Sequence, residues 1–185
     1  MLALLGSWFV SWRSECAREK KKRVFAIKML FISLSHNQRS MLDQKQAIQN
    51  RINQGFDSMF RTQWPIDNLD LHDYRKSFYF LADESDAGFL KSLYHINFLL
   101  KCILRLKKTI AFMFGKITPE TRNKFKENAS ILDEKSVLYK ASIPYQMYIK
   151  YIDFYLSETS NLMKHLKKYA KDENIVLPEI FPPEG

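Results

Sequence analysis

Apolar residues recur at steps of three and four through the first part of the chain, which is the spacing of one face of an α-helix. From residue 24 to residue 59, eight of the eleven positions at this spacing are large and apolar: Val24, Ile27, Phe31, Leu34, Gln38, Met41, Lys45, Ile48, Ile52, Gly55 and Met59. The pattern predicts a long helix over 24–59 whose apolar face packs against other helices. Gln38 and Lys45 interrupt that face, and a buried polar group costs free energy unless it is paired or reaches solvent.

Two later stretches repeat this helical spacing. The series in 87–114 is Phe89, Leu93, Ile96, Leu100, Ile103, Lys107, Ile110 and Phe114. The series in 144–171 is rich in tyrosine: Tyr145, Tyr148, Ile152, Tyr155, Thr159, Leu162, Leu166 and Tyr169. A short helix is predicted over 72–81, and evidence for strands is minimal. We therefore expect an all-α fold, an antiparallel bundle of four to six helices with a long N-terminal helix.

Turn and cap signals mark the breaks between the predicted helices. Proline, aspartate and asparagine favour a turn at 64–70, and the acidic run 83–86 supplies a cap for the helix that follows. Thr118, before a proline and a glutamate, predicts another helix start, and 130–133 resembles a further one. Pro144 either kinks or restarts the last helix. The chain then divides into a head and neck over 1–23, a bundle over 24–173, and a proline-rich, non-helical tail over 174–185.

The first 23 residues differ in composition from the rest. Residues 1–12 (MLALLGSWFVSW) are mostly apolar, and 13–23 holds six basic residues against two acidic ones, a local net charge of +4. An apolar segment bounded by tryptophan and followed by lysine and arginine is typical of a helix that leaves the bilayer on its cytoplasmic side. The residues expected to contact an anionic membrane surface are Trp8, Trp12, Arg13, Arg18, Lys20, Lys21, Lys22 and Arg23.

The length of the apolar segment leaves three interpretations open. Twelve helical residues span about 18 Å, whereas the hydrocarbon core of a bilayer is about 30 Å thick. Residues 1–12 are a short membrane span, a helix in the interface with its basic neck on anionic headgroups, or a soluble helix end that packs on the core. A cleaved signal peptide is disfavoured because the basic residues follow the apolar stretch instead of preceding it.

The order of these features is an apolar Leu2 to Trp12, a basic Arg13 to Arg23, and a helix with heptad spacing. It resembles the architecture of small, uncharacterised bacterial proteins that are membrane-anchored and helical. The resemblance covers about the first 60 residues. It implies an inner-membrane anchor with a helical domain on the cytoplasmic face; the alternative localisation is cytoplasmic.

Composition narrows the classes of function. A chain of 185 residues that is 46% hydrophobic is long enough to bury one substantial core. Its five glycines do not form the multi-glycine turns of Rossmann or P-loop nucleotide sites. The net charge of +9 favours anionic partners. Cys16 and Cys102 lie far apart in the sequence, which indicates free thiols in a reducing compartment.

Candidates for chemistry are few. The nearest approach to a metal-ligand cluster is Asp67, Asp70, His72 and Asp73. Those residue types equally form a turn with a helix cap. His95 is a candidate general base near the acidic run 83–86, but a histidine beside an apolar face is more often a boundary residue. The sequence has no nucleophile elbow and no kinase signature. We therefore expect no enzymatic activity, no cofactor and no small-molecule substrate.

Two basic stripes are candidates for binding phosphate groups. One consists of Lys101, Arg105 and Lys108, and the other of Lys164, Lys167, Lys168 and Lys171. Lysines near a helix C-terminus also complement the helix dipole. We expect no aromatic residues to interleave with these cations on an exposed face, as a single-strand binding platform requires.

Two functional hypotheses follow from these observations. The first is a non-enzymatic, membrane-associated helical protein that mediates interaction with a protein partner or with a second copy of itself. The alternative is a soluble basic protein that binds nucleic acid or a nucleoprotein assembly.

Overall fold

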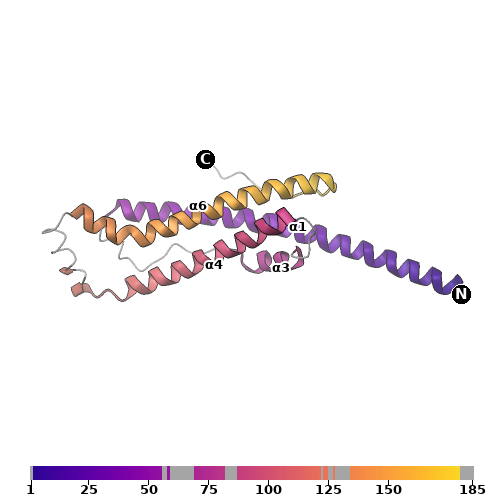
Figure 1. The fold of residues 1–185 in the computed structure, drawn as a ribbon, viewed down its shortest axis with the longest axis horizontal. Coiled ribbons are helices and arrows are strands. Elements are labelled where there is room, and N and C mark those ends of the chain that lie inside the picture. The colour runs from indigo at the N-terminus through magenta and orange to yellow at the C-terminus, as the bar shows by residue number, and fades with distance from the viewer. Residues whose placement is uncertain are drawn as a thin grey trace. The chain divides into compact units, whose positions relative to one another are not determined.

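The computed structural model of the chain is all-α (Figure 1), as the sequence predicts. It describes residues 2–55, 58, 69–81, 87–121, 123, 124, 127 and 134–179, and of 2–10, 114, 115 and 134–141 it describes the backbone alone. The helices described from end to end are α1 (Leu2–Asn53), α3 (His72–Leu81), α4 (Ala87–Gly115) and α6 (Glu134–Asp172). No strand occurs in the residues so described.

Contacts within the chain define two compact units. The first comprises Met1–His36, Asp70–Leu93 and Asn161–Gly185, and the second comprises Asn37–Leu69 and Tyr94–Ser160. Helices α1, α4 and α6 therefore each contribute one part to each unit. The segmentation into 1–23, 24–173 and 174–185 stays a prediction from composition, because the units group residues by contact and not by chain order.

In the second unit, α1 and α6 run antiparallel. Gln38 of α1 donates hydrogen bonds to Thr159 (2.9 Å) and Ser160 (3.1 Å) of α6. Further along α1, Lys45 forms an ion pair of 2.6 Å with Asp153. The two residues that interrupt the apolar face therefore both have partners. Around them lies a buried core: Met41, Ile48, Ile96, Leu99, Leu100, Ile103, Ile110, Tyr145, Tyr148, Ile152 and Tyr155.

Buried hydrogen bonds add to this core. Tyr148 donates a hydrogen bond of 2.6 Å to the side-chain oxygen of Gln44, and both side chains are buried. Burial raises the pKa of Tyr155 well above its usual value, and the nearby Asn37 opposes part of the rise. Burial also raises the pKa of Tyr145, against the opposing effect of Arg51 nearby. The polar groups thus specify the register of α1 against α6.

The first unit packs the early part of α1 against α3 and the end of α6. Its buried apolar residues are Ala26, Ile27, Leu30, Phe31, Leu34, Tyr74, Phe78, Leu81, Leu93, Leu162, Leu166 and Ala170. Asp70 joins α3 to α1: one carboxylate oxygen accepts a hydrogen bond of 2.6 Å from Ser33, and the other accepts the backbone N–H of Asp73 at 3.1 Å. The second bond caps the N-terminus of α3.

Two helix limits differ from the predicted ones. Helix α1 begins at Leu2, so the head and neck continue into the predicted 24–59 helix, and it ends at Asn53 instead of Met59. The reason is Gly55, whose φ of 87° lies outside helical geometry. Helix α6 begins at Glu134 and continues through Pro144, which does not restart it. The predicted turns at 64–68 and 83–86 and the start at 130–133 lie outside the described residues.

The other limits agree with the sequence. The predicted helix over 72–81 is confirmed, and the hydroxyl of Thr118 accepts the backbone N–H of Thr121 at 3.2 Å, as a helix cap does. At the end of α6, backbone N–H groups of Ile175 and Asn174 donate to the carbonyls of Ala170 (2.7 Å) and Lys171 (3.2 Å). These are the two bonds of a Schellman motif. The helix therefore ends where the non-helical tail was predicted to begin.

Candidate functional sites

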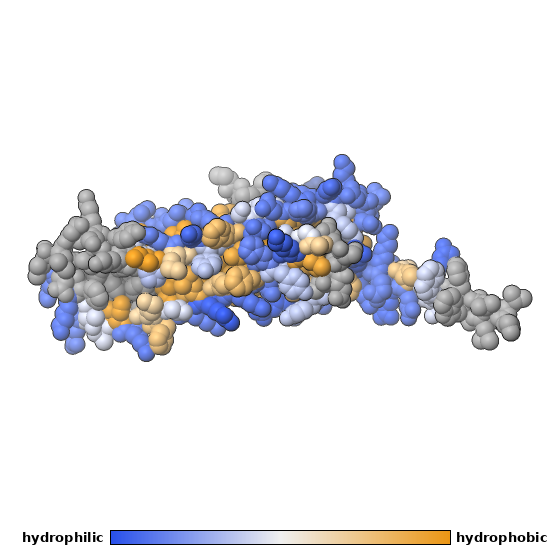
Figure 2. All heavy atoms as spheres, viewed as in Figure 1, coloured by the Kyte–Doolittle hydropathy of each residue, from blue (hydrophilic) through white to orange (hydrophobic). Residues whose placement is uncertain are grey.

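The basic neck of α1 is a stretch of exposed helix. Every residue from Ser11 to Lys22 is exposed, and Trp12 retains 51% of its accessible surface. In Figure 2 the part of α1 next to the grey N-terminal atoms is mostly blue, the colour of hydrophilic residues, with a few paler and orange ones among them. An α-helix turns about 100° per residue, so the cations of the neck spread over an arc of roughly 200° around the helix: Arg13, Arg18, Lys20, Lys21 and Lys22. Glu15, Glu19 and Trp12 lie on the remaining side. The neck is therefore positive over more than half of its circumference.

Two of the predicted surface-binding residues, Arg23 and Trp8, differ from the exposed cations of the neck. Arg23 is half-buried, and its guanidinium lies 5.4 Å from the ring centroid of Tyr169 on α6. It therefore takes part in packing within the first unit, unlike the exposed cations before it. The side chain of Trp8 lies outside the described residues. Within the neck, Glu19 forms an ion pair of 2.7 Å with Lys22.

The hydrophobicity of the helices bears on the prediction of a membrane span. Among the described helices, none combines the length and the apolar character needed to cross a membrane.

An open hollow of about 590 Å³ lies between α1 and α3, next to the neck. Its apolar surface is formed by Phe25, Ala26, Met29 and Phe80, and three lysines and Asp73 lie at its edge. Phe25 is 58% exposed. The lysines are Lys21, Lys22 and Lys76. The hollow thus combines exposed aromatic rings with a net positive edge.

The basic stripe on α4 lies on an exposed face that also carries aromatic rings. Lys101, Arg105 and Lys108 are exposed, as predicted. No ring lies between these cations, as expected, but three rings flank them: Tyr94, Phe98 and Phe112 are 53%, 60% and 62% exposed. The six residues recur at steps of four and three, so they share one side of the helix. We call the six residues the α4 face. Sequence periodicity did not reveal these flanking rings, because the buried face one or two positions away has the same spacing.

The lysines near the end of α6 are a simpler case. Lys164, Lys167, Lys168 and Lys171 are exposed, and Lys167 lies 5.8 Å from the ring centroid of Phe31. No exposed aromatic ring separates them, since the one ring among them, Tyr169, is half-buried. Substitution of these lysines is therefore a control of similar charge for substitutions in the neck and on the α4 face.

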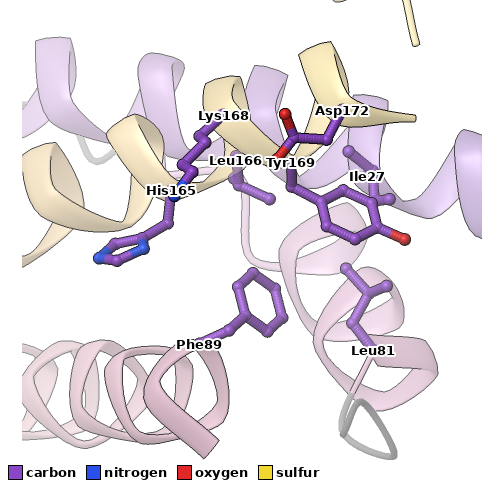
Figure 3. Close-up of a pocket in the computed structure, with 8 residues that line it drawn as sticks. All are labelled: Ile27, Leu81, Phe89, His165, Leu166, Lys168, Tyr169 and Asp172. Atoms are coloured by element: carbon purple, nitrogen blue, oxygen red, sulfur yellow. The ribbon is translucent and has the colours of Figure 1, made fainter. Parts of the chain in front are cut away.

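A small pocket lies in the first unit (Figure 3). Phe89 of α4 and Leu81 of α3 point toward Tyr169 and Leu166 of α6, and Ile27 of α1 completes the apolar lining. His165, Lys168 and Asp172 stand along the α6 side. The pocket encloses about 210 Å³, which is less than the roughly 300–1,000 Å³ of sites for drug-sized ligands.

The other residues that the sequence offered for chemistry are His95, the aspartates near α3 and the two cysteines. His95 lies 3.6 Å from Glu158 of α6, both at the surface of the second unit. Asp70 caps α3 and accepts the bond from Ser33, whereas Asp67 lies outside the described residues. Within the part of the chain that the structure describes, no three His, Cys, Asp or Glu residues are grouped as metal ligands. Cys16 is exposed and Cys102 is half-buried, and both are free thiols.

Comparison of the chain with protein families, with curated proteins and with solved structures found no match in any of the three.

Proposed function

We propose that this protein is a non-enzymatic helical protein that attaches to anionic membrane surfaces through its neck and presents its helical units to a protein partner. The exposed cations of the neck carry the proposal. A helix that lies flat on a membrane concentrates its charge along one face. Cations spread over more than half of the circumference instead suit a helix surrounded by headgroups, where each Lys or Arg near the anionic surface contributes about 1 kcal/mol.

Trp12 supports this orientation. It lies directly before the first cation of the neck and is exposed, and tryptophan is enriched at the level of the headgroups in membrane proteins. Localisation at the cytoplasmic face of the inner membrane belongs to the same proposal. It rests on the sequence order of apolar head, tryptophan and basic neck.

The experiment is co-sedimentation with vesicles. The full chain should pellet with vesicles of phosphatidylglycerol and phosphatidylcholine, and should remain in the supernatant with phosphatidylcholine alone or at high salt. Triple reversal of neck charges by Arg13→Glu, Arg18→Glu and Lys20→Glu should weaken binding by at least about 100-fold. The matched control is Lys164→Glu, Lys168→Glu and Lys171→Glu, which changes the net charge equally. Equal losses in both variants would count against a specific role of the neck.

The hollow between α1 and α3 supports the second half of the proposal. Exposed apolar surface bordered by charge is typical of protein interaction sites, and the lysine edge favours a partner segment that carries acidic residues. Sedimentation equilibrium distinguishes the two kinds of partner. If the partner is a second copy, the chain should dimerise with increasing concentration, and Phe25→Ser with Phe80→Ser should abolish dimerisation. A chain that stays monomeric would leave a different protein as the partner.

A further inference from the structure

We propose that the α4 face binds single-stranded nucleic acid, with its cations on backbone phosphates and its rings stacked on bases. This inference is independent of membrane attachment, because it rests on Tyr94, Phe98, Lys101, Arg105, Lys108 and Phe112, all of which belong to the second unit.

The arrangement of these residues is the first argument. Two rings precede the three cations and one ring follows them, all at steps of four and three along α4. From residue 94 to residue 112 the helix is about 27 Å long at 1.5 Å per residue. A single strand presents phosphates and bases along one line, and every base offers a flat face for stacking. An extended strand laid along α4 would therefore meet both kinds of group.

Charge is the second argument. Helix α4 contains no aspartate or glutamate in its 29 residues. The terminal ring is itself paired with a cation, since Lys116 Nζ lies 4.0 Å from the ring centroid of Phe112. Glu158 contacts α4 from α6, but it does so at His95. The α4 face therefore carries positive charge and no acidic residue. This charge attracts an anionic strand. An acidic protein would be attracted by the same charge but would have no need of stacking rings.

The position of the cations distinguishes this ligand from a membrane. A helix that binds in a bilayer interface separates a continuous apolar face from a polar face. On the α4 face the three cations lie between the rings on the same line, so they would interrupt any apolar surface that enters the acyl region. Exposed aromatic rings at both ends of a basic stretch are better used for stacking.

Fluorescence anisotropy with a labelled single-stranded oligothymidine tests the proposal on the full chain. Binding should be tighter than to a duplex of the same length, because paired bases do not offer their faces. With three phosphate contacts, the slope of log K against log salt should be about −2 for a single strand. Reversal by Lys101→Glu, Arg105→Glu and Lys108→Glu should abolish binding, whereas Lys164→Glu, Lys168→Glu and Lys171→Glu should retain most of it.

Ring substitutions separate stacking from simple attraction between charges. Phe98→Leu and Phe112→Leu keep apolar side chains but remove the flat rings, and each should weaken single-strand binding by roughly 5- to 150-fold. Tyr79→Leu, at an exposed ring on α3, is the matched control and should have no effect. Circular dichroism confirms that each variant is folded. Equal binding of single strand and duplex, or leucine variants that bind like the wild type, would overturn the proposal. The proposal would also be overturned if the chain did not bind the oligonucleotide and reversal of the α4 cations abolished its binding to vesicles.

Discussion

Helix α1 passes through two contrasting environments. Over residues 11–22 every side chain is exposed, and the charged residues there include only one described ion pair, between Lys22 and Glu19. Between residues 37 and 48 three of its polar side chains, Gln38, Gln44 and Lys45, meet partners on α6. The same residue type, lysine, thus forms an ion pair across to α6 at Lys45 and is exposed in the neck. Exposure and partners, not residue type, separate the two environments.

The largest effect on stability should come from the buried apolar residues of α1 between residues 37 and 48. Ile48 is fully buried, and truncation of a buried isoleucine to alanine costs about 2–5 kcal/mol. We expect Ile48→Ala to lower the free energy of unfolding by that amount in urea titrations. Lys21→Ala in the exposed neck should change it by no more than about 0.5 kcal/mol. Similar losses for the two substitutions would remove the contrast between the environments.

The next effect should come from the buried hydrogen bond between Tyr148 and Gln44. Tyr148→Phe removes the donor and leaves the glutamine oxygen short of one bond, which costs about 1–3 kcal/mol. The measurement is again urea unfolding. Gln44→Met combined with Tyr148→Phe should cost less than the sum of the single changes, because the two residues are coupled. Strict additivity would mean that the bond contributes little.

A smaller effect is expected at the ion pair between Lys45 and Asp153. Both side chains are partly exposed, and exposed pairs contribute about 0.2–1 kcal/mol. Lys45→Met should therefore destabilise the chain slightly, or not at all, and any loss should shrink at high salt. A loss above about 2 kcal/mol, insensitive to salt, would show that the pair behaves as a buried one.

The last effect on stability comes from the buried hydroxyl of Tyr155 and appears only at alkaline pH. Burial raises the pKa of Tyr155 above its ordinary value of 10.0, so above pH 10 the unfolded chain loses this proton while the folded chain keeps it. Stability is therefore fully present below pH 10 and falls as the pH rises toward the folded-state pKa. Tyr155→Phe should reduce this loss, with the rest arising in part from Tyr145, whose pKa burial also raises.

The measurement is the free energy of unfolding between pH 9 and pH 11. Tyr79→Phe, at an exposed side chain of α3, is the control and should keep the pH dependence of the wild type. An unchanged pH dependence in Tyr155→Phe would show that the buried hydroxyl does not govern stability in alkali.

Much of the fold could be predicted from local patterns. The period of apolar residues identified α1, α4 and α6, and the short helix α3 was predicted at its observed limits. Helix ends were predicted less well, because Gly55 ends α1 through a left-handed backbone that the apolar period does not reveal. Pro144 lies inside α6, where packing against α1 outweighs the lost backbone hydrogen bond.

Interactions between distant residues could not be predicted. Lys45 finds Asp153 across 108 positions of chain, and nothing near either residue indicates the other. The basic residues of the neck and of α4 were identified from sequence, but exposure of Phe98 and Phe112 was not, since a phenylalanine on a helix is ordinarily assigned to the core. Only the packing of α4 shows which of its apolar residues are left outside.

The exposed thiol of Cys16, within the neck, allows a direct measurement of whether the neck lies within a layer of anionic headgroups, as we propose. An environment-sensitive fluorophore on Cys16, in a Cys102→Ser background, should shift its emission to the blue when vesicles containing phosphatidylglycerol are added. Salt should reverse the shift, and phosphatidylcholine vesicles should cause none. An unchanged emission while the protein co-sediments with the anionic vesicles would show that another surface binds the membrane and would contradict the proposal.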